Sequence, residues 1–207
     1  MRRNNFLLSG FLIILTLAFL YRESILAIVN INEPVPIVSI VFNNNKELKI
    51  ELYPHYAPNT VNNFLDLAES GFYEYTFISQ VVPGYFVKMG DPIGNGFGFP
   101  GYHIKSECSF NNFDNGLNLT RGTVAMARGK EFNTEGSQFF ILTENAKNLN
   151  GQYSAFGRVV DGLELLDEFG TLELNSNYQP KKQIFIKEIS IELNGYVKTA
   201  PIIYTTD

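Results

Sequence analysis

Hydrophobic and polar positions alternate along several short stretches of the chain, a pattern typical of half-buried β-strands. The clearest case is Leu48, Ile50 and Leu52, which alternate with Lys49 and Glu51. Other stretches are mostly apolar runs bounded by turn residues. Further strands are predicted at 37–42, 76–82, 85–89, 122–127, 138–141, 155–160 and 184–193. Many short strands with few helices indicate a mainly β domain.

Two segments have helical rather than β periodicity. The first covers about 59–70, where Asn59 or Thr60 is the expected N-cap and Gly71 ends the helix. Its apolar stripe, spaced to face the core, is Val61, Phe64, Leu65 and Ala68. A second, short helix is predicted at 163–169. Because no βαβ rhythm is present, the pattern favours a closed antiparallel β-barrel capped by two α-helices.

The first 29 residues differ from the rest of the chain. Arg2 and Arg3 precede the apolar run 6–21, which is long for a signal-peptide core and short for a full membrane span. An uncleaved signal anchor is expected, with a cleaved signal peptide as the alternative. Either would place the folded domain on the extracytoplasmic side of the membrane. The expected organisation is 1–29 signal or anchor, 30–36 linker, 37–197 folded domain and 198–207 C-terminal tail.

Composition narrows the classes of function. The chain carries a net charge of −5 and has no basic run, which argues against a nucleic-acid partner. Cys108 is the single cysteine, so an internal disulfide is excluded. With His55 and His103 as the only histidines, no metal-ligand cluster stands out, and no cofactor is expected. A monomer is expected.

The stretch Gly122–Ile141, GTVAMARGKEFNTEGSQFFI, predicts two strands joined by a polar loop. Along the second strand Gln138 and Phe140 point one way and Phe139 and Ile141 the other. One face can therefore close a core while the other presents an amide beside an aromatic ring. That combination suits a shallow apolar binding site with a few polar groups, although core packing alone explains the same residues.

This stretch resembles the signature of the cyclophilin-type peptidyl-prolyl cis–trans isomerases. Other segments are similar to that family in the same order and at the same spacing, over about Val38 to Leu193. They are Val82-Pro83-Gly84-Tyr85 with Gly90-Asp91, Gly94-Asn95-Gly96-Phe97-Gly98, Leu149-Asn150-Gly151 and Phe156-Gly157. The resemblance implies an eight-stranded barrel capped by two helices. It also implies isomerisation of X–Pro bonds in peptides and unfolded proteins, in support of protein folding.

The resemblance also assigns roles to residues. A proline pocket would be formed by Phe86, Phe140 and Leu149, with Tyr85 alongside. The peptide backbone would be bound at Ala127, Arg128 and Gln138, and Tyr153 would stand near the pocket rim. Plain core packing for the apolar residues, and ordinary surface positions for Arg128 and Tyr153, are the alternatives.

Two matched positions depart from the family pattern. Counting back from Pro83, Gln80 stands where the family has its catalytic Arg, and counting forward, Lys88 stands where it has a Gln. A neutral amide does not replace a guanidinium, which supplies fixed, always-charged donors. One hypothesis is that the cation has moved to the neighbouring strand, so that Gln80 and Lys88 together form the catalytic pair. The alternatives are that Lys88 extends to water from the barrel rim, and that the chain is a proline-binding module with weak or no catalysis.

Overall fold

The structure is a computed structural model in which residues 34–205 are described. The segment 1–29, predicted as a signal peptide or anchor, lies outside these residues. Among the described helices, none has the length and hydropathy that a membrane span requires. Val35–Asp207 forms a single compact unit.

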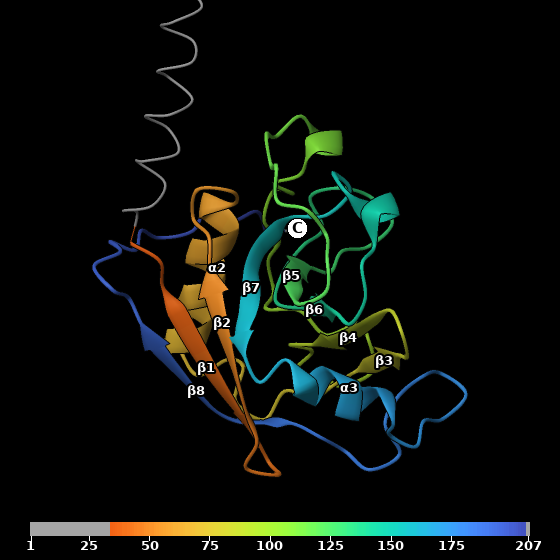
Figure 1. Cartoon of the computed structure of the whole chain (residues 1–207). Coiled ribbons are helices and arrows are strands. Elements are labelled where there is room, and N and C mark those ends of the chain that lie inside the picture. Colours follow the sequence, from red (N-terminus) through yellow and green to blue (C-terminus); the bar gives the residue numbers. More distant parts are fainter. Residues whose placement is uncertain (1–33, 206–207) are drawn as a thin grey trace, which may run out of the picture. The chain divides into compact units, whose positions relative to one another are not determined.

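Eight strands pair in antiparallel fashion in one curled sheet (Figure 1), which confirms the predicted mainly β class. Their order across the sheet is β3-β4-β6-β5-β7-β2-β1-β8. Their bounds are β1 (Ile37–Phe42), β2 (Glu47–Leu52), β3 (Gln80–Val82), β4 (Phe86–Met89), β5 (Thr123–Met126), β6 (Phe139–Leu142), β7 (Ala155–Asp161) and β8 (Ile186–Glu192).

The two edges of the sheet, β3 and β8, are linked by the segment that precedes β3. Phe77 bridges to Phe185, and the Ile78 amide donates to the Ile184 carbonyl at 2.9 Å. The predicted strand 76–82 is thus wrong in length, since only Gln80–Val82 joins the main ladder. The residues before Gln80 pair on both sides. The Ser79 amide donates to the Lys88 carbonyl at 2.9 Å and Phe77 bridges to Asp91, just after β4, while Phe77 and Ile78 also pair with the chain entering β8 and so bring the two edges together.

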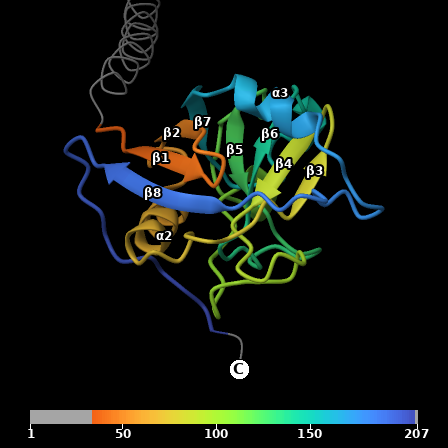
Figure 2. The same ribbon diagram turned by 90° about the horizontal axis from the view of Figure 1, so that it is seen from below.

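Helices α2 (Pro58–Glu69) and α3 (Glu164–Gly170) lie at opposite ends of the curled sheet (Figure 2). The predicted cap at Asn59 or Thr60 is wrong, because the helix begins one residue earlier with Pro58 after Ala57. A proline suits the first helical position, where its missing N–H leaves no donor unsatisfied. The cap comes from far along the chain: the Glu107 carboxylate accepts the Asn59 and Thr60 amides at 3.1 and 2.8 Å.

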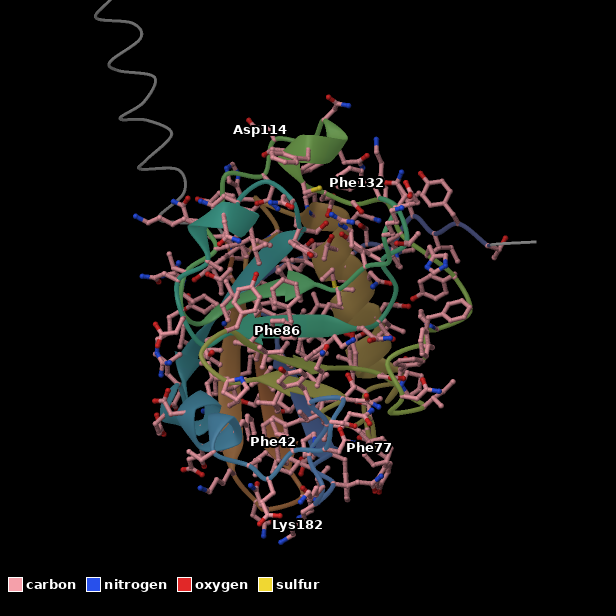
Figure 3. All side chains as sticks on the ribbon, turned by 90° about the vertical axis from the view of Figure 1, so that its right-hand side faces the viewer. Phe42, Phe77, Phe86, Asp114, Phe132 and Lys182 are labelled. Atoms are coloured by element: carbon pink, nitrogen blue, oxygen red, sulfur yellow. The ribbon has the colours of Figure 1, made fainter. Side chains whose placement is uncertain are left out.

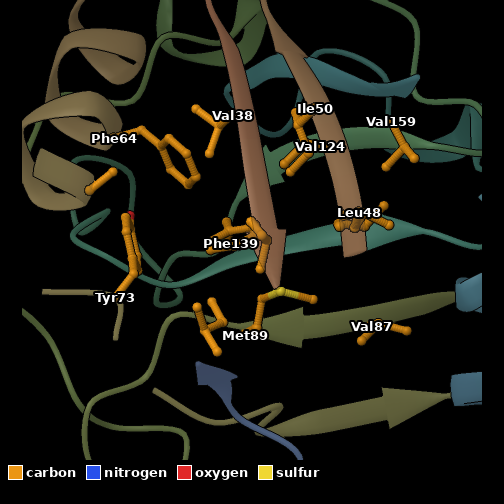
Figure 4. Packing of buried hydrophobic residues seen from close by; sticks show 14 of the residues in the cluster. Val38, Leu48, Ile50, Phe64, Tyr73, Val87, Met89, Val124, Phe139 and Val159 are labelled. Atoms are coloured by element: carbon orange, nitrogen blue, oxygen red, sulfur yellow. The ribbon is translucent and has the colours of Figure 1, made fainter. Parts of the chain in front are cut away.

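The main core fills the space between α2 and the concave face of the sheet (Figure 4). Phe64 of α2 packs edge-to-face against Phe139 of β6, with ring centroids 5.2 Å apart. Its ring is tilted against that of Tyr73, with centroids 4.9 Å apart. The Tyr73 hydroxyl donates to the Ser137 carbonyl at 3.1 Å, so the polar group of this buried side chain has a hydrogen-bond partner. At the other end of the sheet, Phe169 of α3 packs on Phe42 at 5.2 Å.

Two carboxyl groups are buried between the sheet and the long 91–121 segment. Glu135 is fully buried, and its two oxygens accept the Ser154 hydroxyl at 2.8 Å. Ser154 in turn accepts the Glu107 amide at 2.7 Å. Burial raises the pKa of Glu135 to about 8, and Glu107 adds to that shift while Ser154, Ser106 and Arg128 oppose it. At neutral pH Glu135 is therefore mostly a neutral acid.

The C-terminal residues after β8 run along α2 and end beside the 99–104 loop. Asn59 exchanges two hydrogen bonds with the Ile202 backbone at 3.0 and 2.7 Å. The Asn62 side chain donates to the Thr199 hydroxyl at 3.0 Å and accepts the Thr199 amide at 3.1 Å. Tyr204 then pairs with the His103 backbone in both directions, at 2.8 and 2.7 Å. We call Lys198–Tyr204 the C-terminal strap; it ties α2 to the loop that carries His103.

We predict that removing Pro201–Asp207 weakens this tie without unfolding the domain. Because the hydrogen bonds of Asn59 and His103 to the strap are lost, the free energy of unfolding should fall by about 1–3 kcal/mol. Amide hydrogen exchange should speed up at His103, whereas Ile104, whose amide is held by the Glu135 carbonyl, should keep its protection and serves as the internal control. Unchanged exchange at His103 would contradict the assignment.

Glu135 should make stability fall as the pH rises. Its pKa is raised from the ordinary 4.5 to about 8 in the native state. The folded chain therefore holds a proton that the unfolded chain releases, and between these two values rising pH favours unfolding, by at most about 1.4 kcal/mol per pH unit. Glu135→Gln, which stays neutral, should flatten this slope in urea denaturation at successive pH values. Glu131→Gln, at an exposed carboxylate, should leave it unchanged, and equal slopes for all three proteins would refute the assignment.

Candidate functional site

A row of paired residues crosses four strands and builds the site. Gln80 of β3 lies opposite Lys88 of β4, and Lys88 lies opposite Phe140 of β6. Phe140 in turn lies opposite Ala125 of β5. Residues directly opposite in an antiparallel pair project to the same face, with Cβ atoms about 4.5–5.5 Å apart. Gln80 and Lys88 are therefore immediate neighbours on the face that carries Phe140.

The face of β6 away from the main core carries an apolar cavity of about 200 Å³. Three aromatic rings, those of Phe86, Phe140 and Tyr153, form one wall of this cavity. The centroid of Phe140 lies 5.8 Å from that of Phe86 and 5.2 Å from that of Tyr153. Leu149 reaches it from the short 3₁₀-helix η2 (Lys147–Leu149). The lining consists of Gln80, Tyr85, Phe86, Lys88, Ala127, Arg128, Phe140, Leu149 and Tyr153. This set contains every site residue predicted from the sequence except Gln138. Phe86 is seen near the centre of the face in Figure 3.

Gln138 lies in a second cavity, of about 400 Å³, that adjoins the first. The two share Lys88, Ala127 and Arg128. The remaining walls come from loops: Gly96, Phe97, Gly98, Phe99, His103, Gly129, Thr134, Gly136 and Ser137. This cavity is not predictable from periodicity, because its walls come from irregular segments. The glycine-rich 94–98 loop was the available signal, and it was used only for the resemblance.

The Gln138 amide holds the glycine-rich loop in place. Its Nε2 donates to the carbonyls of Gly96 and Gly98 at 3.0 and 2.7 Å. The buried Asp91 carboxylate also holds this loop, because it accepts hydrogen bonds from the backbone amides of Ile93, Gly96 and Gly98. Within the described residues the Gln138 Oε1 has no hydrogen-bond partner, so it is available to accept an N–H from a bound peptide. The Nε2 of Gln138, which was predicted to bind the peptide backbone, is thus already hydrogen-bonded within the protein, and only its Oε1 remains for a ligand.

Arg128 is held by backbone carbonyls and aromatic rings. Its guanidinium donates to the Gln152 carbonyl at 3.1 and 3.2 Å and lies 4.5 Å from the centroid of Phe132 and 4.9 Å from that of Tyr153. Both are cation–π distances, and Phe132 is seen on the same side of the molecule as Phe86 in Figure 3. The backbone N–H and C=O of Arg128 have no hydrogen bond in the part of the chain that is described. This peptide unit can therefore pair with an extended ligand.

Lys88, like Arg128, is a cation at the junction of the two cavities. Its ammonium points toward the glycine-rich loop, since a Cβ built on Gly96 would lie 3.8 Å from Nζ. No hydrogen bond or ion pair to this ammonium is present among residues 34–205. Burial lowers the pKa of Lys88, and the Asp91 charge partly opposes that shift. An ammonium placed in this way can donate to a ligand in either cavity.

Comparisons with known proteins point to one family. Residues 37–191 match the family model described as cyclophilin type peptidyl-prolyl cis-trans isomerase/CLD. The chain is 38% identical over 152 residues to peptidyl-prolyl cis-trans isomerase-like 3 of Gallus gallus, an alignment covering 72% of this chain and 92% of that protein. It is 43% identical over 122 residues to peptidyl-prolyl cis-trans isomerase B of Bacillus subtilis, covering 58% and 81% respectively.

Solved structures give the same result. A cyclophilin type peptidyl-prolyl cis-trans isomerase of Cryptosporidium parvum superimposes with a TM-score of 0.69 at 34% identity, covering 76% of this chain and 98% of that one. The same protein has been crystallised in the presence of the dipeptide Ala-Pro, and that structure gives a TM-score of 0.68. On the family match, the sequence identities and the shared fold, this chain belongs to the cyclophilin-type peptidyl-prolyl cis–trans isomerase family.

Proposed function

We propose that this chain is an active peptidyl-prolyl cis–trans isomerase that acts on X–Pro bonds of peptides and unfolded proteins. The observation that carries the proposal is the position of Lys88. Its ammonium has no partner in the described protein and stands beside Gln80 at the edge of the apolar cavity. The site therefore combines an apolar pocket with hydrogen-bond donors at its rim.

The chemistry of the reaction requires little more. Rotation about an X–Pro bond crosses a barrier of about 18–20 kcal/mol, because the planar amide loses its resonance on twisting. Twisting localises the nitrogen lone pair, so a donor aimed at the prolyl nitrogen stabilises the twisted state more than either planar form. In this proposal Phe86, Phe140 and Leu149 hold the ring, and Lys88 and Gln80 are the donors. The free backbone of Arg128 and the Gln138 Oε1 hold the flanking peptide.

We also propose that the domain works outside the cytoplasm, on proteins that fold there. The support is the sequence alone, in which two arginines precede the apolar run of residues 6–21. The N-terminal sequence of the mature protein would distinguish an uncleaved anchor from a cleaved signal peptide.

The competing function is a proline-binding module that retains the pocket but not the turnover. The observation in its favour is Gln80 itself, since a neutral amide replaces the family's charged, pre-organised donor. Both candidates predict that a proline peptide binds at the apolar cavity. They differ in whether its cis–trans exchange is accelerated.

We predict that the full-length chain accelerates exchange of a short proline peptide, measured by NMR exchange spectroscopy. Lys88→Ala should lower kcat/KM by about 10²–10³-fold, the usual cost of removing one transition-state donor. The double variant Gln80→Arg/Lys88→Gln, which restores the family's pair of side chains, should recover most of that loss. Lys182→Ala, at an exposed position at the lower edge of the molecule and away from Phe86 at its centre (Figure 3), should have no effect. Binding without acceleration would favour the module, and an active protein indifferent to Lys88→Ala would exclude the swapped pair.

We predict an alkaline limit to this activity. Because burial lowers the pKa of Lys88, the ammonium loses its proton at a lower pH than an ordinary lysine, and the rate should fall as the pH rises through that value. The Gln80→Arg/Lys88→Gln variant should keep its rate over the same interval, since a guanidinium does not titrate there. The check is the pH dependence of kcat/KM for the two proteins; parallel profiles would argue against Lys88 as the donor.

A further inference from the structure

The second cavity has an unusual charge for a chain that is acidic overall. The net charge of the protein is −5, yet the charged and imidazole side chains that line the two cavities are Lys88, Arg128 and His103. No Asp or Glu lines either cavity in the part of the chain described. Local charge at a binding site selects the charge of its ligand, whatever the net charge of the molecule.

The nearby carboxyl groups offset this charge only in part: the Asp91 charge acts on Lys88, but no carboxyl group lines either cavity in the described part of the chain. Asp91 is buried beneath the glycine-rich loop, where its oxygens accept three backbone amides. Glu135, between Thr134 and Gly136 of the cavity wall, is held mostly neutral at pH 7 by a pKa raised to about 8. Glu131, on the loop between Arg128 and Thr134, is exposed and lines neither cavity.

The three basic side chains differ in how many of their polar groups have hydrogen-bond partners within the described protein. Arg128 is hydrogen-bonded to neutral carbonyls, so its positive charge is not cancelled. The His103 ring stacks on Phe99 with centroids 5.2 Å apart, and its buried Nδ1 has no hydrogen-bond partner within the described residues. The Lys88 ammonium is likewise unpaired there. Two polar groups in one cavity wall thus lack a protein partner.

The geometry points to an acidic side chain as the occupant of this cavity. We propose that the protein prefers peptides in which Asp or Glu lies close in sequence to the X–Pro bond, with the carboxylate in the second cavity against Lys88. The inference rests on the proposed function for the position of the proline in the first cavity. Because the cavities share Lys88, Ala127 and Arg128, one extended peptide can fill both.

The two roles of Lys88 are compatible. An ammonium carries three N–H donors, so one can be directed at the prolyl nitrogen while another meets the carboxylate. A carboxylate bound there would also favour the charged form of Lys88. The acidic residue would thereby support the protonation state that the proposed isomerisation needs.

The test is a comparison of matched peptides that differ by one charge. Glu-Ala-Pro and Gln-Ala-Pro peptides, and the reversed Pro-Ala-Glu and Pro-Ala-Gln, are titrated into the full-length chain in nonionic detergent, and Kd is read from NMR shifts. At about 20 mM salt the Glu peptide should bind about three- to tenfold more tightly than its Gln partner in one of the two orders. About 500 mM salt should shrink that ratio, because the interaction is electrostatic.

Variants then locate the charge that is responsible. Lys88→Gln should remove most of the preference for the Glu peptide, leaving what the Arg128 charge contributes. Lys182→Ala, at an exposed position outside both cavities, should leave the preference intact. Equal affinities in both orders at low salt, or a preference that Lys88→Gln leaves undiminished, would overturn the proposal. Since Kd does not depend on turnover, a failure of isomerisation and a failure of the charge preference are seen separately.

Discussion

The alternation of side chains along β6 is the constraint on which both the core and the site depend. Phe139 and Ile141 are fully buried in the main core, while Phe140 on the opposite face forms the wall of the apolar cavity. A one-residue slip of this strand would exchange the two faces. The cluster of Phe64, Tyr73 and Phe139 opposes such a slip, because three large rings would lose their contacts together. The binding face is therefore held in register by the packing behind it.

Much of the fold was predictable, because the strongest signals were local. The stripe of α2 and the alternation in β2 and β6 each follow from the spacing of apolar residues, and all three elements are present within one or two residues of the predicted bounds. The features that were missed depend on contacts distant in sequence. The cap of α2 is Glu107, some 47 residues away, and a glutamate in the middle of a long loop does not indicate burial.

The candidate site likewise has a part that local sequence signals predict and a part that depends on contacts distant in sequence. The residues of the apolar cavity lie on strands or beside matched motifs, so their positions followed from register and resemblance. The second cavity is enclosed by loops, and the glycine-rich loop is held by hydrogen bonds that Gln138 donates and that Asp91 accepts. Nothing in the order of residues from 96 to 103 reveals that these backbones converge. The pairing of Gln80 with Lys88 was predictable only in part. Counting from Pro83 identifies the two positions, but that they lie opposite each other depends on a strand register that only the structure supplies.

The proposed exchange of the cation between β3 and β4 is a small change in space. Opposite residues on β3 and β4 are separated by one strand spacing of about 4.7–4.9 Å, which the flexible stem of a lysine can span. A lysine in place of an arginine nevertheless changes the chemistry of the position. It gives up the rigid fork of donors and gains a group that titrates. A site built in this way can respond to its surroundings where a guanidinium would not.

The C-terminal strap determines what lies near the binding cavities. Because Tyr204 is paired with His103, whose ring lines the second cavity, any sequence appended after Asp207 is joined to the chain only a few residues from the site. Such an extension is present at a high effective concentration, set by tether length and not by bulk solution. If it contained a proline, it would compete with every free peptide. For this protein, affinity tags and fused partners belong at a point remote from that terminus.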